Sequence, residues 1–194
     1  KAVRPDVLCL QETKCPDDKF PLKRFKRLGY EHVALNGQKG YHGVAVLSRV
    51  PFVKTDAREF CAKGDARHMC VTLPGDIELH NFYVPAGGDI PDPKANPKFA
   101  HKLQFLDEME AMFSKMRSKG SARRVVVGDL NVAPFEHDVW SHKQLLNVVS
   151  HTPPETERMM AGYAAHDWID VTRSLVPHDQ KIFSWWSYRN QDWK

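Results

Sequence analysis

The stretch VVVGDLNVAP, residues 125–134, places two polar side chains shortly after a run of three valines. A β-branched run of this kind is typical of a strand that is buried on both faces. Side chains alternate between the two faces of a strand, so Asp129 and Asn131 are expected to share one face. Alone, the pattern also fits an ordinary strand end followed by an Asp/Asn turn. The rest of the chain has to decide between a turn and a functional site.

The composition indicates a single globular domain over residues 1–194. With 42% hydrophobic residues the chain can bury a sizeable core. No apolar run approaches the ~20 residues that a membrane span needs, and the first residues do not resemble a signal peptide. The four cysteines have no metal-binding spacing and fit a reducing compartment. We therefore expect a cytoplasmic monomer that makes no membrane contact.

The positive charge of the chain is concentrated in two segments. The formal net charge is +4, and lysines and arginines cluster in KFPLKRFKR at 19–27 and in KMRSKGSARR at 115–124. Such clusters favour a polyanionic partner such as double-stranded DNA. They also occur on the solvated faces of ordinary helices, and the sequence leaves this alternative open.

Short apolar or alternating runs separated by Gly, Pro and Asp predict seven strands. These strands are expected at residues 7–10, 31–35, 43–48, 68–73, 77–84, 125–131 and 182–188. Apolar residues at steps of three and four predict a long amphipathic helix within 97–120, and shorter helices are expected near 20–29 and 155–166. This order of elements indicates an α/β sandwich with helices outside the sheets.

Three of the expected strands end in residues that can bind a metal ion or a phosphate. PDVLCLQETK delivers Glu12, IELHNFYVPAGG presents Tyr83, and VVVGDLN ends in Asp129 and Asn131. Hard oxygen ligands suit Mg²⁺ or Mn²⁺, and a phenol can contact a phosphate oxygen. Each strand end has an ordinary explanation by itself, but together they predict one site for a divalent ion and a phosphate.

Five segments in a fixed order resemble the exonuclease III family of DNA-repair nucleases. They are LQETK, KGYHGVAVLSR, NFYVPAGG, VVVGDLNVAP and FSWWSYR, and the likeness covers essentially the whole chain. The resemblance implies a four-layer α/β sandwich of the deoxyribonuclease I type, with two mixed β-sheets flanked by helices. It also implies a metal-dependent hydrolase of base-excision repair that acts as an abasic-site endonuclease and a 3′ to 5′ exonuclease. The implied cofactor is Mg²⁺, or Mn²⁺ in its place, and the implied partner is double-stranded DNA with abasic sites or 3′ ends.

The same resemblance assigns roles to the strand-end residues. Glu12 matches the family's metal-binding glutamate, and Tyr83 matches its phosphate-contacting tyrosine. Asp129 matches the aspartate that positions or deprotonates the attacking water, and Asn131 matches the asparagine of the site. These four residues form the expected catalytic and metal-binding group.

Four further residues are expected to meet the substrate. Trp185 falls where the family places an aromatic ring against an abasic sugar, although aromatic residues equally often serve as packing bulk. Lys98 and Arg67 are candidates for phosphate contacts, and His42 is expected in a loop close to the site.

Three motifs of the family have no match at their expected places in this sequence: a W-N motif on the first strand, and an R-x-D segment and an S-D-H motif after the last matched segment. The sequence is therefore expected to be the middle of the enzyme, incomplete at both ends and inactive as it stands. The alternatives are another phosphoesterase of the same superfamily, acting on inositol phosphates or sphingomyelin, and a non-catalytic DNA-binding remnant.

Overall fold

The computed structural model describes residues 3–118 and 123–185, and the chain forms two compact units. The first unit comprises residues 1–84 and 121–130, and the second comprises residues 85–120 and 131–194. The single domain expected over residues 1–194 stays a prediction.

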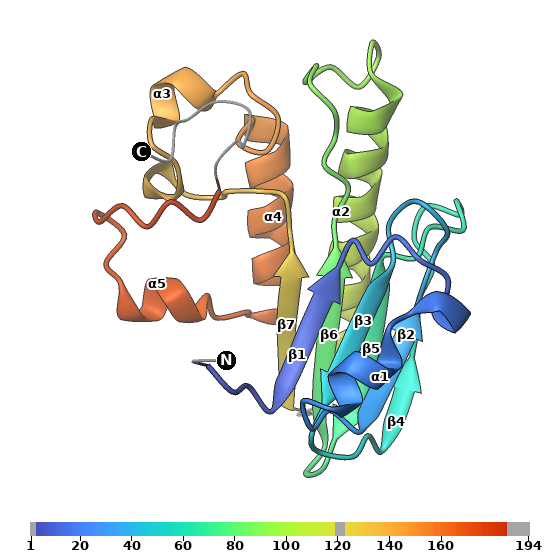
Figure 1. Cartoon of the computed structure of the whole chain (residues 1–194). Helices are drawn as coiled ribbons and strands as arrows, with labels where there is room; N and C mark the ends of the chain where they lie inside the picture. Colours follow the sequence, from blue (N-terminus) through green and yellow to red (C-terminus); the bar gives the residue numbers. More distant parts are fainter. Residues whose placement is uncertain (1–2, 119–122, 186–194) are drawn as a thin grey trace. The chain divides into compact units, whose positions relative to one another are not determined.

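The first unit contains two β-sheets that pack face to face (Figure 1). The three-stranded sheet is antiparallel and has the order β1 (Val7–Gln11), β3 (Val44–Ser48), β2 (His32–Asn36). The four-stranded sheet has the order β4 (Lys54–Asp56), β5 (His68–Leu73), β6 (Ile77–Tyr83), β7 (Arg123–Asp129). Its pairs are antiparallel except β6 and β7, which run parallel, so this sheet is mixed. The expected α/β sandwich is confirmed.

The core of the first unit follows the alternation of side chains along β3. Val44 and Val46 face the second sheet, where Met69 and Val71 meet them. Ala45 and Leu47 point to the other face, where they pack beside Phe20 and the short helix α1 (Leu22–Lys26). All five residues of β3 are buried, because this strand is central in its sheet and covered on both faces.

Six of the seven predicted strands are present, and the seventh is wrong in its described part. Residues 182–185 form no strand; their backbone bonds run from Ile182 N–H to His137 O and from Trp185 N–H to Asp138 O, in a loop. Residues 186–188 lie outside the described part. The sequence also missed β4, whose three residues are all exposed and show no apolar alternation.

The expectation that residues 125–131 form a strand buried on both faces is also wrong. In the described part of its sheet β7 is an edge strand, and Val125 is 42% exposed. The strand ends at Asp129, and Asn131 has a left-handed φ of 49°, so the two-residue alternation does not reach it. Gly128 is required for the pairing with β6, since a Cβ there would lie 2.0 Å from the carbonyl oxygen of Phe82.

The second unit is built around two helices, α2 (Pro97–Arg117) and α4 (Pro153–His166), which pack along each other (Figure 1). Both were predicted, and α2 begins where Asn96 caps the N–H of Lys98. The shorter elements are α3 (His142–Leu145), α5 (Val171–Leu175) and the 3-10 turns η1 (Asp17–Lys19) and η2 (Glu136–Asp138), of which η1 belongs to the first unit. Within residues 3–118 and 123–185, the helices lack the length and apolar content to span a bilayer.

Two buried histidines pair on the face of the four-stranded sheet that turns away from the sandwich core. Nδ1 of His68 accepts the backbone N–H of Arg58 at 3.2 Å. The other ring nitrogen of His68 therefore carries the proton, and it donates to Nδ1 of His80 at 3.0 Å. Burial lowers the pKa of His68 to about 3, and the neighbouring His80 adds to this effect. His68 is therefore neutral in the folded protein at pH 7.

We expect the His68 pair to make the protein sensitive to acid. An unfolded histidine titrates near pH ~6.5. Below that pH the unfolded chain binds a proton that His68 does not bind in the folded protein. The free energy of unfolding should be at its full value above pH ~6.5 and should fall as the pH drops toward about 3, the folded pKa of His68. At ~1.4 kcal/mol per pKa unit the loss amounts to a few kcal/mol.

Urea unfolding of His68→Gln and of the parent chain between pH 7 and pH 4.5 would measure this effect. The variant should be less stable at pH 7 but should lose less stability on acidification. His178→Gln, at an exposed position, is the matched control and should keep the parent slope. An unchanged slope in His68→Gln would assign the acid sensitivity to other groups.

Candidate active site

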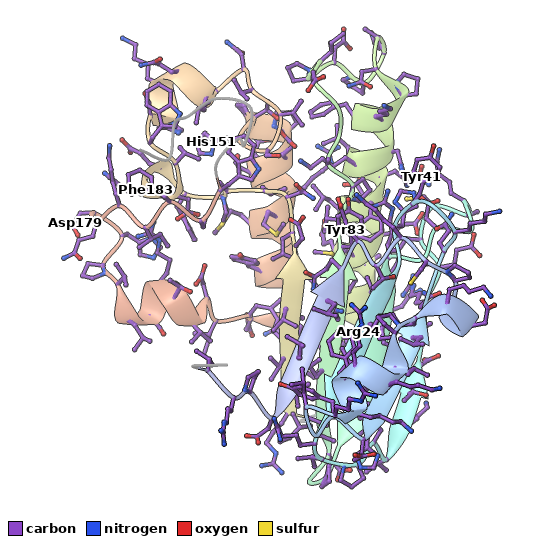
Figure 2. All side chains as sticks on the ribbon, in the orientation of Figure 1. Arg24, Tyr41, Tyr83, His151, Asp179 and Phe183 are labelled. Atoms are coloured by element: carbon purple, nitrogen blue, oxygen red, sulfur yellow. The ribbon has the colours of Figure 1, made fainter. Side chains whose placement is uncertain are left out.

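The candidate site lies at the end of the first unit where β1, β6 and β7 terminate. Glu12 directly follows β1, while Tyr83 and Asp129 are the last residues of β6 and β7 and are partners in the parallel register. Figure 2 shows Tyr83 at the arrowhead end of β6. β3 and β5 run antiparallel to these strands, so the residues that precede them, His42 and Arg67, come to the same end.

Glu12 is held by two donors. The Tyr83 hydroxyl donates to its Oε1, and Lys14 Nζ lies 2.7 Å from its Oε2. The bond to Lys14, followed by the bond to Tyr83, lowers the pKa of Glu12, so this carboxylate is ionised at neutral pH. Glu12 has a left-handed φ of 53°, a strained conformation that tends to occur at functional sites. Its side chain is 45% exposed and therefore within reach of solvent and ligands.

Tyr83 is a hydrogen-bond donor throughout the physiological pH range. Burial raises the pKa of its hydroxyl, and so do the hydrogen bond to Glu12 and the charges of Glu12 and Asp129. The guanidinium of Arg67 lies over the ring, 4.9 Å from its centroid, and opposes the shift only in part. The phenol therefore stays protonated and can donate to an anionic oxygen.

Arg67 contacts both the ring and the backbone of Tyr83. It is 6% exposed, and its Nη1 donates to the backbone oxygen of Tyr83 at 3.2 Å. Its Nε bonds Asp65 at 3.1 Å, and its Nη2 lies 3.5 Å from Nε2 of His42. Burial and the positive charge of Arg67 lower the pKa of His42, so that ring is neutral at pH 7. These contacts make Arg67 a support for Tyr83, and its phosphate contact stays a prediction.

Asn81 is a functional candidate that the sequence reasoning missed. It is completely buried, and its Nδ2 donates to the backbone oxygens of Leu10 at 3.0 Å and Ala45 at 3.1 Å. Its Oδ1 accepts a bond from the Gln11 side chain at 2.6 Å. The Asn81 side chain thus joins the two sheets. Its partner Gln11 directly precedes Glu12, and Asn81 itself lies two residues before Tyr83 on β6. The available signal was a polar residue at an inward position of β6.

The remaining predicted residues belong to the second unit. The backbone oxygen of Asn131 accepts a bond from Lys102 Nζ at 2.6 Å. Lys98 lies in the first turn of α2. Trp185 packs against an apolar cluster that comprises Ala133, Val139, Trp140 and Leu145. Packing bulk is thus one role of this tryptophan, and its contact with an abasic sugar stays a prediction.

Glu12 has the chemistry to hold a divalent cation. Mg²⁺ is usually bound through one or two carboxylates together with substrate phosphates and water, and Glu12 is ionised and half exposed. Among the described residues, no group of three or more Asp, Glu, His or Cys side chains could hold a metal. These residues therefore fit an ion that a phosphate and water help to bind, and they do not form a closed protein cage.

Comparison with known proteins gives consistent matches over the whole chain. The profile of the Endonuclease/Exonuclease/phosphatase family matches residues 1–194. Exodeoxyribonuclease III of Haemophilus influenzae is 29% identical over 204 residues, which cover 97% of this chain and 72% of that protein. The DNA-(apurinic or apyrimidinic site) endonuclease of Dictyostelium discoideum is 30% identical over 195 residues, 95% of this chain and half of that protein.

The solved structure of an AP endonuclease from Archaeoglobus fulgidus has a TM-score of 0.83 to this chain at 31% sequence identity. The match covers 97% of this chain and 70% of that structure. This chain therefore spans between half and about three quarters of the length of these three proteins.

Proposed function

We propose that this chain, which belongs to the endonuclease/exonuclease/phosphatase family, carries the central catalytic strand ends of a DNA-repair nuclease. The resemblance to exonuclease III seen in the sequence is confirmed by the relatives. The proposed reaction is hydrolysis of a DNA phosphodiester at an abasic site or a 3′ end, supported by Mg²⁺ or Mn²⁺. The observation that carries the proposal is the contact of the Tyr83 hydroxyl with ionised Glu12 beside the end of β7.

In this proposal the reaction is an in-line attack of water on phosphorus. The water oxygen bonds to phosphorus as the bond from phosphorus to the 3′ oxygen breaks, and the departing 3′ oxygen takes a proton from solvent. Asp129 orients the water and accepts its proton, and Asn131 is assigned to the same catalytic group. The Tyr83 hydroxyl, which donates to Glu12 in the structure, would exchange that bond for one to a non-bridging phosphate oxygen, and burial keeps it protonated for this role. A divalent ion held by Glu12, when bound, would offset negative charge on the phosphate and the departing oxygen.

The proposal is tested on the complete gene product with an end-labelled duplex that carries one abasic site. Cleavage at that site in Mg²⁺, lost in EDTA and much slower on the same duplex with an intact base, is the expected result. Hydrolysis of inositol polyphosphate or sphingomyelin without DNA cleavage would instead identify another phosphoesterase. DNA binding without any turnover would identify a non-catalytic remnant.

The basic segment around α1 gives a separate prediction about binding. Lys23, Arg24 and Lys26 are exposed on this helix, and Figure 2 labels Arg24 on it. If they meet DNA phosphates, duplex affinity falls with salt at a logarithmic slope of about −0.9 per phosphate neutralised. Lys23→Ala/Arg24→Ala should make the slope less negative by roughly 1 to 2.

Fluorescence anisotropy at a series of salt concentrations measures this slope. A double variant at two other exposed lysines, Lys54→Ala/Lys143→Ala, removes the same charge and should change the slope less. Equal slopes in the two double variants would mean that residues 19–27 form a solvated helix face without a specific role in DNA binding.

A further inference from the structure

A fully buried ion pair joins the two long helices of the second unit. Lys102 on α2 and Glu155 in the first turn of α4 are in direct contact, and both side chains are 0% exposed. Removing two charges from water is costly, and a well-packed apolar pair at such a place is often equally stable. A gain in stability is therefore a weak explanation for the presence of this ion pair. Its hydrogen bonds to the backbone indicate a different role.

The Lys102 ammonium bonds the backbone just after the two strand ends that carry the proposed catalytic residues. Its Nζ donates to the carbonyl oxygen of Asn131 at 2.6 Å and lies 3.3 Å from the carbonyl oxygen of Ala86. Along the chain, Asn131 is two residues after Asp129, and Ala86 is three residues after Tyr83. One side chain thus holds both connecting segments where they enter the second unit.

Glu155 also holds the segment after Asp129, through its hydrogen bonds with Ser150. The Ser150 N–H donates to both carboxylate oxygens of Glu155 at 2.9 Å, and its hydroxyl lies 3.2 Å from Lys102 Nζ. Ser150 has a left-handed φ of 87°, which a non-glycine residue adopts only where its surroundings enforce it. Its carbonyl oxygen accepts the N–H of Ala133 at 2.8 Å.

The segment 131–133 is therefore held along its length. Lys102 binds its first carbonyl, and Ser150 binds the N–H of Ala133. His151, labelled in Figure 2, places its Nδ1 2.7 Å from the oxygen of Ala133. The stem of Lys102 reaches this position past Gly87, where a Cβ would lie 2.8 Å from its Cδ. The glycine at position 87 thus makes room for the lysine stem.

We propose that Lys102, through its ion pair with Glu155, is a positioning residue that sets the backbone of Asn131 for the reaction. The inference rests on the proposed function, in which Asn131 belongs to the catalytic group. Loss of the lysine would let the carbonyl of Asn131 shift, and displacements of about 1 Å in a catalytic group can cost ~10²-fold in rate. We therefore expect kcat to fall ~10–100-fold while KM changes little, as is found when residues that support a site are removed.

The test separates positioning from stability by removing one charge or both. In the complete gene product, Lys102→Met leaves Glu155 buried without its partner and should destabilise the fold. Lys102→Met/Glu155→Gln removes both charges and should recover most of the lost stability. The double variant should nevertheless keep the low kcat, because the Asn131 carbonyl still lacks its donor. Rates are measured on abasic duplex at a temperature where every variant is folded.

A second buried ion pair in the same unit provides the matched control. Arg173 and Asp138 lie 2.5 Å apart and are 2% and 3% exposed, and Arg173 binds the backbone oxygens of Pro177 and Gln180. Arg173→Met/Asp138→Asn should change stability comparably and leave kcat near the parent value. A Lys102→Met/Glu155→Gln variant with restored stability and parent kcat would overturn the proposal, as would a loss that appears only in KM.

Amide hydrogen exchange tests the positioning role of Lys102 without any substrate, and so independently of the proposed function. In the folded double variant at positions 102 and 155, the Ala133 amide should exchange at least ~10-fold faster than in the parent and the control pair variant. Unchanged protection of Ala133 would refute the positioning role whatever the substrate. Faster exchange in a protein that does not cleave abasic DNA would instead leave the positioning role standing and refute the proposed function.

Discussion

Asp129→Asn is expected to abolish turnover of abasic DNA in the complete gene product while leaving folding and DNA binding intact. Asp129 is the exposed last residue of β7, and its carbonyl oxygen, which the substitution leaves unchanged, accepts the N–H of Val84 at 2.9 Å. The substitution keeps the shape of the side chain but removes the carboxylate that we propose as the acceptor of the water proton. Loss of general base catalysis costs ~10²–10⁴-fold, so kcat should fall at least that far.

Single-turnover cleavage measures the effect on chemistry, and anisotropy and thermal unfolding measure binding and stability. Asp56→Asn, which neutralises an exposed carboxylate on β4, is the matched control and should retain parent activity. Full activity in Asp129→Asn would show that the aspartate does not belong to the catalytic group. The segment GDLN would then be an ordinary strand end.

The sequence predicted those parts of the fold that have a local periodic signal. β3 was predicted because it is a short apolar run, and α2 because its apolar residues recur every three or four positions. β4 has no apolar pattern to detect. Residues 182–185 are rich in residues that favour strands, yet their backbone bonds go to a loop, which local propensity cannot reveal. The valines before Asp129 show strand preference, and their partial exposure depends on the position of β7 at the edge of the sheet as far as the structure describes it.

The candidate site divides in the same way. The position of Glu12 next to Tyr83 follows from strand ends and known motifs, so it could be expected. The roles of Asn81 and Lys102 could not, because their partners lie far away in the sequence: Asn81 bonds β1 across 71 residues, and Lys102 bonds Asn131 across 29. A lysine within a helix is expected in solvent, and only the packing of α2 against α4 buries this one.

The second large effect is expected at Glu12. Glu12→Gln removes the charge that would hold the divalent ion, so the Mg²⁺ concentration for half-maximal cleavage should rise at least ~10-fold and kcat should fall ~10²–10³-fold. Tyr83→Phe removes the proposed donor to the phosphate and should lower kcat by a similar factor without moving the Mg²⁺ midpoint. Equal Mg²⁺ midpoints in the parent and Glu12→Gln would exclude Glu12 as a metal ligand.

The coupling between the two residues can also be observed without substrate or metal, through the titration of the tyrosine. Burial raises the pKa of Tyr83 most, and the hydrogen bond to Glu12 and the charge of that carboxylate raise it further. Glu12→Gln removes the charge and leaves the burial, so the pKa of Tyr83 should fall toward its ordinary value. The ultraviolet difference between Glu12→Gln and Glu12→Gln/Tyr83→Phe isolates this hydroxyl from the other tyrosines. A Tyr83 pKa that does not move would mean that Glu12 contributes nothing to it, and that the Glu12 carboxylate does not accept the hydrogen bond of the phenol.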